Sequence, residues 1–452
     1  MYATSEAAAG SAIDSRARQF PPVTDTRDRA VDLVRSASLF VVVLLHAMMV
    51  GVSVVDGDLS VGNAIADSGW FVPVSWLIQV MPLFFIVGGF ASITSWRRMR
   101  ARGASWTEYV NGRLQRLTVP AVVMISAVGL GLAIAQAAGM PADLLAEASL
   151  RIGQPLWFLA VYIGCSALVP IMSALHFRAR RLTLLGLLIG VVGVDALRMG
   201  SGLDGFGYLN LAFVWLLIQQ LGFVYADGWL EARSRRQLIV GLCASLAVLV
   251  VITGTGLYSA DMLTNLNPPT VCLVLLGVGQ LCLFGLIRPA LNRWMANTSR
   301  QRAVTLLGDH AMTVYLWHMP VILAIVSVMI ATRMPLPEPQ SATWWVTRPL
   351  WLLTIAIVTF PVAMLLARVE ASSGNAQWQS LLPARRLVRG WAPSAAGPLA
   401  VVLGIAGICT VLLAGFAPLL WTVVGAALLL ASLNIMGGAS GITRPGLPRP
   451  LG

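Results

Sequence analysis

Ten apolar segments follow one another along the chain. Each is long enough, or nearly so, to cross the roughly 30 Å hydrocarbon core of a bilayer. Of the 452 residues, 57% are hydrophobic and 11% are charged, against about 25% charged in a soluble domain. Such a chain cannot cover its surface in water, and in lipid only helices satisfy their own backbone without closing a barrel. We therefore predict an all-α, polytopic membrane protein with spans at 31–55, 70–96, 117–138, 155–175, 182–197, 207–226, 238–257, 270–288, 308–331 and 348–367.

A further apolar block at 397–435 follows this ten-span membrane domain, which we place at 31–370. Ala417–Pro418 near its middle predicts a helical hairpin of two short spans, with one tilted span as the alternative. The block carries no acidic or basic side chain. We expect it to be dispensable for chemistry, with its part in folding and partner binding left open.

The remaining segments are polar. Residues 1–30 lack the apolar stretch of a cleaved signal peptide, so we interpret them as a flexible cytoplasmic tail. Residues 371–396 are interpreted as a linker and 436–452 as a second flexible tail.

All 31 basic residues are arginine, and the net charge is +12. The arginines cluster in short groups between the apolar segments, which is the positive-inside pattern of a membrane protein and not a nucleic-acid surface. With the N-terminus inside, 27 arginines lie on the inner side and four outside. The absence of lysine is typical of bacteria with GC-rich genomes, so we predict a multi-pass protein of the bacterial cytoplasmic membrane. The four outer arginines are Arg151, Arg198, Arg333 and Arg348.

The five cysteines are scattered singly inside apolar stretches. No CxxC pair and no Cys/His spacing is present, so we expect neither a disulfide framework nor a metal site. Nothing in the sequence calls for a bound cofactor.

The first span carries a polar track on an otherwise apolar helix. Arg35 and His46 are eleven residues apart, which at 100° per residue places both on one face, about 16 Å apart along the axis. Asp32 lies one turn before Arg35 on the same stripe. Polar groups inside lipid are costly and are functional candidates. The alternative is that Asp32 and Arg35 anchor the helix and His46 makes a packing hydrogen bond.

Other polar and aromatic side chains accompany the later spans. Tyr315 and His318 are three residues apart and share a helix face in the ninth span, while Trp157 opens the fourth. Interfacial belt positions are the alternative for Tyr315 and Trp157. We interpret His310 as a residue of a helix cap and His176, in the cluster HFRARR, as a solvated flank.

Arg113 and Arg116 are three residues apart on a helix that enters the third span. Two guanidinium groups on one face suit a phosphate-bearing ligand, and ordinary positive-inside anchoring is the alternative. In the second span, Gln79, Pro82 and the pair Gly88–Gly89 predict a broken, closely packed helix.

These segments together resemble the acyltransferase 3 family of membrane O-acyltransferases, over about residues 31–370. The family's first motif, an arginine and a histidine separated by ten residues, corresponds to Arg35 and His46. Its second motif, Arg-x-x-Arg, corresponds to Arg113 and Arg116. Gly88 stands where the family commonly has serine, so no hydroxyl acts there. Three further family signatures occur in order as PLFFIVGGF (82–90), PLWFL (155–159) and YLWHMPV (315–321).

The resemblance implies transfer of a short acyl group, from acyl-CoA on the cytosolic side, to a hydroxyl of a sugar, a glycolipid or a small metabolite. Acyl-CoA would then be a co-substrate bound by Arg35, Arg113 and Arg116. His46 would be catalytic, either as general base or as transient acyl carrier, with His318 as the second candidate. Three residues are assigned to the substrate pocket: Asp32, Trp157 and Tyr315.

A transporter or exporter of a small molecule or lipid-linked substrate is the rival hypothesis. Ten to twelve spans and intramembrane histidines would suit one, but the sequence shows no pair of inverted repeats and no matched broken helices. A structural or sensor protein explains the aligned Arg35–His46 track least well.

Overall fold

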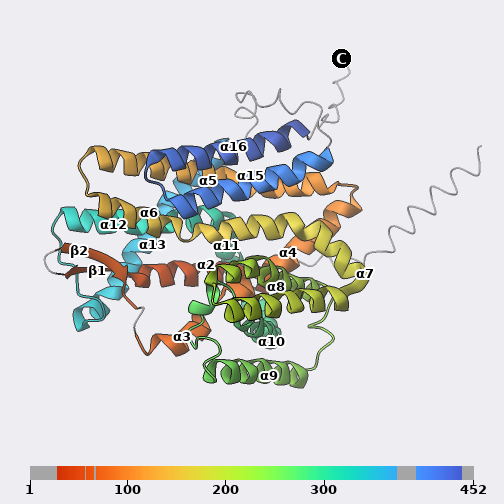
Figure 1. Cartoon of the computed structure of the whole chain (residues 1–452). Helices are drawn as coiled ribbons and strands as arrows, with labels where there is room; N and C mark the ends of the chain where they lie inside the picture. The colour runs from red at the N-terminus through yellow and green to blue at the C-terminus, as the bar shows by residue number, and fades with distance from the viewer. Residues whose placement is uncertain (1–27, 56–57, 66–67, 374–392, 440–452) are drawn as a thin grey trace, which may run out of the picture. The chain divides into compact units, whose positions relative to one another are not determined.

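The computed structural model describes residues 28–55, 58–65, 68–373 and 393–439. The predictions for 1–27, for most of the linker and for the end of the chain lie outside these residues. Helices dominate the described chain (Figure 1). In order, the elements are α2 (Arg29–Met49), β1 (Val50–Val55), β2 (Asp58–Asn63), α3 (Phe71–Ile78), α4 (Met81–Ala101), α5 (Trp106–Ala137), α6 (Ala142–Gly153), α7 (Leu156–Ser201), the 3-10 helix η1 (Asp204–Leu209), α8 (Asn210–Ala226), α9 (Arg235–Gly254), η2 (Thr264–Leu266), α10 (Val271–Trp294), α11 (Thr298–Asp309), α12 (Ala311–Ala331), α13 (Ala342–Ser373), α15 (Pro393–Ala414) and α16 (Leu419–Ala439).

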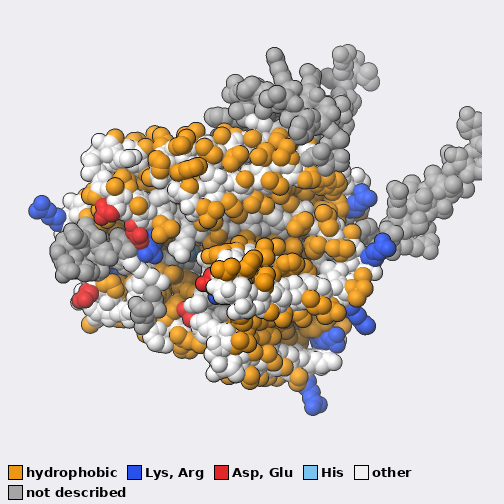
Figure 2. Space-filling view, viewed as in Figure 1, with side chains coloured by type: hydrophobic (Ala, Val, Ile, Leu, Met, Phe, Trp, Pro, Cys, Tyr) orange, Lys and Arg blue, Asp and Glu red, His pale blue; other side chains and the backbone are white. Residues whose placement is uncertain are grey.

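Ten helical stretches within the described residues are long and apolar enough to cross a membrane. One of them, Ala142–Ser201, contains both the fourth and the fifth predicted spans, and another, Ala396–Ala414, belongs to the C-terminal block. The shorter apolar helix Leu419–Ile435 completes the hairpin. Figure 2 shows that hydrophobic side chains are spread over the visible face, while arginine and acidic side chains are few there. The prediction of an all-α, multi-pass membrane protein with a C-terminal hairpin is confirmed.

The first span is shorter than predicted. Helix α2 ends at Met49, and residues 50–55, which we had expected to complete the span, form strand β1. β1 pairs antiparallel with β2 in a register that joins Val50 to Asn63. Four of the six residues of β1 are valine and one is glycine, so the segment has lower helix propensity than the sequence LLHAMM that ends α2.

The boundary predicted at 176–181 is a sharp kink and not an open loop. Two helices meet within α7 at Ala179, where φ is −156° and ψ is 60°, so the fourth and fifth predicted spans are separate helices. Arginine and alanine are good helix formers, so the two helices extend into the HFRARR sequence and only Ala179 departs from helical geometry. A further helix, α6, occupies an expected loop, and its Arg151 donates to Glu147 one turn away at 2.6 Å.

The second span is broken as predicted, between α3 and α4. Pro82 lies in the first turn of α4, where its missing N–H costs nothing. The amide of Gln280 on α10 satisfies backbone groups on both sides of the break. Its Nε2 donates to the carbonyl of Gln79 at 2.7 Å, and its Oε1 accepts from the N–H of Leu83 at 2.9 Å.

The chain divides into two compact units. Unit 1 comprises residues 1–104, 168–311 and 329–354, and within it α4 packs along α8, while α10 packs against α9, α4, α8 and α2. Glycines bring α4 and α8 close together. A Cβ on Gly89 would lie 2.4 Å from the carbonyl oxygen of Gln219, and one on Gly222 would lie 2.1 Å from that of Ile86.

Unit 2 comprises residues 105–167, 312–328 and 355–452. Here α15 and α16 pack on each other and on α5 (Figure 1). The side chain of Thr422 on α16 packs against Gly129 of α5, and the ring of Trp106 packs against Gly397 of α15. The Ser149 hydroxyl of α6 accepts from the N–H of Phe416 at 2.6 Å. The hairpin is therefore an integral part of this unit.

We expect Gly222→Ala to destabilise unit 1 by about 1–3 kcal/mol, because the added methyl group meets a backbone oxygen that cannot move aside. The measurement is thermal unfolding of the purified protein in detergent. Gly186→Ala on α7 is the matched control, since a Cβ there meets nothing within 4 Å. Equal unfolding midpoints for the two variants would contradict the close packing of α4 and α8.

Candidate functional site

Helix α2 presents the polar track predicted from the sequence. The carboxylate of Asp28 caps the helix by accepting from the N–H of Ala30 at 3.1 Å, and Asp32 lies in the first turn, where it complements the helix dipole. The helix continues without a break from Arg29 to Met49. Arg35 and His46 therefore share one face.

Arg35 is half-buried, and its Nε is a buried donor without a hydrogen-bond partner among the described residues. An unsatisfied buried N–H costs about 1–3 kcal/mol. An anionic ligand at this position would supply the missing acceptor.

The His46 ring is oriented by its own helix. Nδ1 lies 2.9 Å from the carbonyl oxygen of Val42. A carbonyl only accepts, so Nδ1 must carry hydrogen, and the lone pair of the neutral ring is on Nε2. This tautomer presents Nε2 as the nitrogen that can take a proton or attack a carbonyl.

A polar cluster fixes the N-terminus of α2. Asp28 accepts from the hydroxyl of Tyr225 on α8 and from Nε of Arg288 on α10, the latter at 2.8 Å. Arg288 also pairs with Glu231, and the side chain of Asn292 accepts from the N–H of Ala30. The sequence analysis missed this cluster, because its members are widely separated along the chain.

His176 lies in a buried polar cluster, so its interpretation as a solvated flank is wrong. Its side chain is 2% exposed, with Nδ1 2.7 Å from Gln220 Oε1 and Nε2 2.8 Å from Asp227 Oδ2. Arg97 of α4 donates to the same carboxylate at 2.6 Å. Because α7 stays helical to the kink at Ala179, His176 faces α8 and not solvent.

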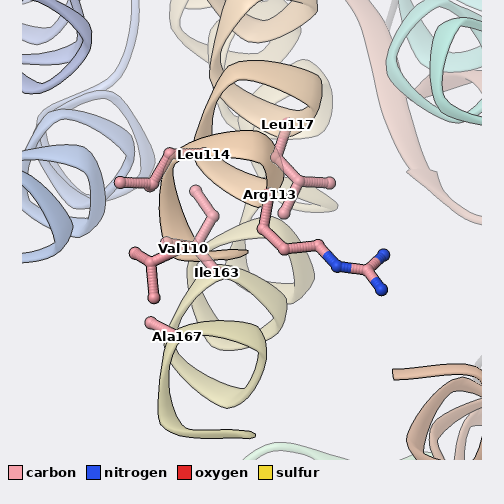
Figure 3. Close-up of a pocket in the computed structure, with 6 residues that line it drawn as sticks. All are labelled: Val110, Arg113, Leu114, Leu117, Ile163 and Ala167. Atoms are coloured by element: carbon pink, nitrogen blue, oxygen red, sulfur yellow. The ribbon is translucent and has the colours of Figure 1, made fainter. Parts of the chain in front are cut away.

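The arginine pair of unit 2 lies on α5, whose start is fixed by a capping box between Ser105 and Glu108. Arg113 is half-buried, with its guanidinium 5.2 Å from the ring centroid of Tyr109, and Arg116 is exposed. Arg113 borders a shallow apolar hollow, and its guanidinium extends away from the hollow (Figure 3). The other lining residues are Val110, Leu114, Leu117, Ile163 and Ala167.

The remaining candidates of unit 2 lie on α12 and at the start of α7. The Tyr315 hydroxyl donates to the carbonyl of Pro155, and its ring packs edge-on against Phe158 at 5.1 Å. His318 is fully buried, and its Nδ1 lies 2.5 Å from the carbonyl of Tyr315. Trp157 is half-buried, next to Phe158. The structure thus brings the PLWFL and YLWHMPV segments together.

The candidate residues divide between the two units. Asp32, Arg35 and His46 belong to unit 1, and the other five belong to unit 2. His310, interpreted from the sequence as a cap residue, is the C-cap of α11, as predicted.

A family model described as an acyltransferase domain matches residues 28–368. The chain belongs to the acyltransferase 3 family. The match runs from the N-cap of α2 into α13 and stops before α15. Searches of curated proteins and of solved structures give no match. Family membership and the membrane-spanning helices together make the protein a membrane acyltransferase.

We expect Asp227→Asn to destabilise the protein by about 3 kcal/mol or more, because it leaves the buried Arg97 without its counter-ion. Burial raises the pKa of Asp227, but hydrogen bonds from His176 and Arg97 outweigh it and hold that pKa below the usual value. The stabilisation is therefore present at neutral pH and lost as the pH falls through the lowered pKa. Thermal unfolding between pH 7 and pH 3 measures both effects.

Asp204→Asn is the control for the Asp227 variant. Asp204 also pairs with an arginine, Arg198, but it is 81% exposed, and exposed ion pairs contribute little. An Asp227→Asn protein as stable as the Asp204→Asn protein would show that the buried cluster does not support the fold.

Proposed function

We propose that the protein transfers a short acyl group from acyl-CoA to a hydroxyl of a sugar, a glycolipid or a small metabolite. It does so in the bacterial cytoplasmic membrane, with its N-terminus and the donor on the cytosolic side. The observation that carries this proposal is the track on α2. Arg35, with a buried donor that lacks an acceptor, and His46, with its lone pair on Nε2, share one face of a continuous apolar helix.

The donor is held by its phosphates. Acyl-CoA carries phosphate groups at one end and the thioester at the other, and guanidinium groups bind phosphate through paired, charge-assisted hydrogen bonds. Arg35, Arg113 and Arg116 bind these phosphates. The roughly 16 Å rise from Arg35 to His46 is of the order that a pantetheine arm spans, so the thioester reaches His46 along the same face.

His46 then activates the attacking group in one of two ways. As general base, Nε2 takes the acceptor's hydroxyl proton while that oxygen bonds to the thioester carbonyl carbon. The C–S bond breaks, and the CoA thiolate leaves with the proton returned from the imidazolium. As acyl carrier, Nε2 itself attacks the thioester carbonyl carbon and the CoA thiolate leaves; in a second step the acceptor oxygen displaces the imidazole, and the hydroxyl proton is released to the thiolate. Both routes yield an ester and free CoA.

We assign the remaining candidates to binding of the acceptor. His318 and Tyr315 orient the acceptor, with Trp157 alongside, and Asp32 accompanies Arg35 on α2. Tyr315 already donates its hydroxyl to Pro155, so its contribution to the pocket is its ring and its place beside His318.

We expect His46→Ala to fold and bind donor but to lose acyl transfer by about 10²–10⁴-fold, the usual cost of a missing general base. A lost nucleophile costs more. The measurement is CoA release and acyl product formation by the purified protein with a labelled acyl-CoA. A stable His46→Ala protein with near-normal turnover would move the catalytic assignment to His318. Transport of a substrate without any acyl product would favour the exporter hypothesis.

We expect Arg113→Ala to raise the apparent KM for acyl-CoA about tenfold or more, since a charge-assisted hydrogen bond contributes roughly 1.5–3 kcal/mol. Arg113→Lys restores binding only in part, because lysine lacks the bidentate fork. Arg102→Ala is the control, as Arg102 is an exposed arginine of the preceding loop. If donor saturation is unchanged in the Arg113→Ala, Arg116→Ala double variant, the pair serves only to anchor α5.

A further inference from the structure

An arginine lies inside the first apolar turns of α13. Arg348 belongs to the candidate membrane span Ala342–Arg368. A charged side chain within a span is costly and marks a functional position unless a partner neutralises it. Two other arginines near helix ends have such partners: Arg151 pairs with Glu147, and Arg198 pairs with Asp204.

Arg348 is held by tryptophan rings and has no acidic partner among the residues that the structure describes. Its guanidinium carbon lies 4.5 Å from the ring centroid of Trp344 and 5.4 Å from that of Trp351. Its Nε donates to the carbonyl of Trp344 at 3.1 Å. The side chain is half-buried, and neither Nη group has a hydrogen-bond partner in the described chain.

Both tryptophans are fixed against α2. Trp344 is 1% exposed, in a core cluster that also contacts Leu45 and Met48. Trp351 is buried, and its Nε1 donates to the carbonyl of Ala47 at 2.9 Å. Arg348 is therefore positioned beside the end of α2 that is opposite to Arg35, with His46 on the helix between the two arginines.

This arrangement orients the guanidinium group of Arg348 for binding an anion. Contact with two aromatic rings and one backbone carbonyl restricts the orientation of the side chain in advance of binding. The Nη groups then offer a planar set of N–H donors, the geometry that matches a carboxylate or a phosphate. Fixing the donors beforehand lowers the entropy cost of binding.

We propose that Arg348 binds an anionic group, a carboxylate or a phosphate, of the acyl acceptor. The identity of the bound molecule as the acceptor rests on the proposed function, whereas anion binding at Arg348 does not. The acceptor is thus an anionic molecule that enters from the end of α2 opposite to the donor. A bilayer phospholipid headgroup carries the same chemistry and is the other source of the anion.

The first experiment tests anion binding. The full-length protein in nanodiscs of neutral phosphatidylcholine is titrated with dodecyl phosphate, and with dodecyl maltoside as the uncharged probe, and bound ligand is measured by native mass spectrometry. We expect Arg348→Gln to weaken dodecyl phosphate binding about tenfold or more and Arg348→Lys to weaken it less, with maltoside binding unchanged. Arg333→Gln, a loss of an exposed arginine, should match the wild type. Equal dodecyl phosphate binding by wild type and Arg348→Gln overturns the site.

The second experiment identifies the source of the anion. Labelled acetyl-CoA is supplied with cell-envelope extract from a strain that lacks the protein, separated into anionic and neutral fractions. We expect label in the anionic fraction, with an apparent KM for that fraction about tenfold higher in Arg348→Gln and an unchanged KM for acetyl-CoA. Label in the neutral fraction alone overturns the acceptor assignment. Weaker dodecyl phosphate binding with unchanged acyl transfer assigns Arg348 to a phospholipid headgroup instead.

The two experiments can overturn the anion site and the proposed function independently of each other. If the wild type releases no CoA from acetyl-CoA with any fraction, the proposed function and the acceptor assignment both fall. The dodecyl phosphate titration still decides whether Arg348 is an anion site, because its readout does not involve turnover.

Discussion

The absence of water in the bilayer core is the constraint on which this structure depends. Each polar group inside the membrane must find a partner within the protein or in a ligand. Most of the buried charges described here have a partner within the protein: Asp227 forms an ion pair with Arg97, and Asp28 forms an ion pair with Arg288. Arg35 and Arg348 differ, because neither forms an ion pair with an acidic side chain of the described chain. Both lie on or against α2, and that helix is consequently where the chemistry is expected.

Hydropathy and helix-breaking residues predicted most of the fold, because both act locally. The spans, the C-terminal hairpin and the break beside Pro82 can each be predicted from the residues of one short segment, without knowledge of the rest of the chain. The same method misplaced the end of the first span, since a short run of valines suits a strand as well as a helix. It placed the boundary between the fourth and fifth spans correctly at the arginine cluster, but the boundary is a kink at Ala179 and not a loop of six residues.

Candidate site residues were predictable where one continuous helix carries them, as α2 carries Arg35 and His46. Clusters built from distant segments were not. Asp28 meets Arg288, and His176 meets Asp227, through packing that no periodicity reveals. In the sequence, Arg348 stood out only as one of the four arginines that the positive-inside pattern places on the outer side. Its two tryptophans lie four residues before it and three after it on α13, and that helical spacing is the signal that would have found it.

The order of synthesis gives the hairpin a further consequence. Helix α5 is made early, and the helices that cover it, α15 and α16, are made last. Leu114 borders the hollow beside Arg113, and the same side chain packs toward Gly404 of α15. The surroundings of Arg113 are therefore completed only when the final helices insert. A chain that ended before α15 would therefore carry every family signature and still lack the helices that cover α5.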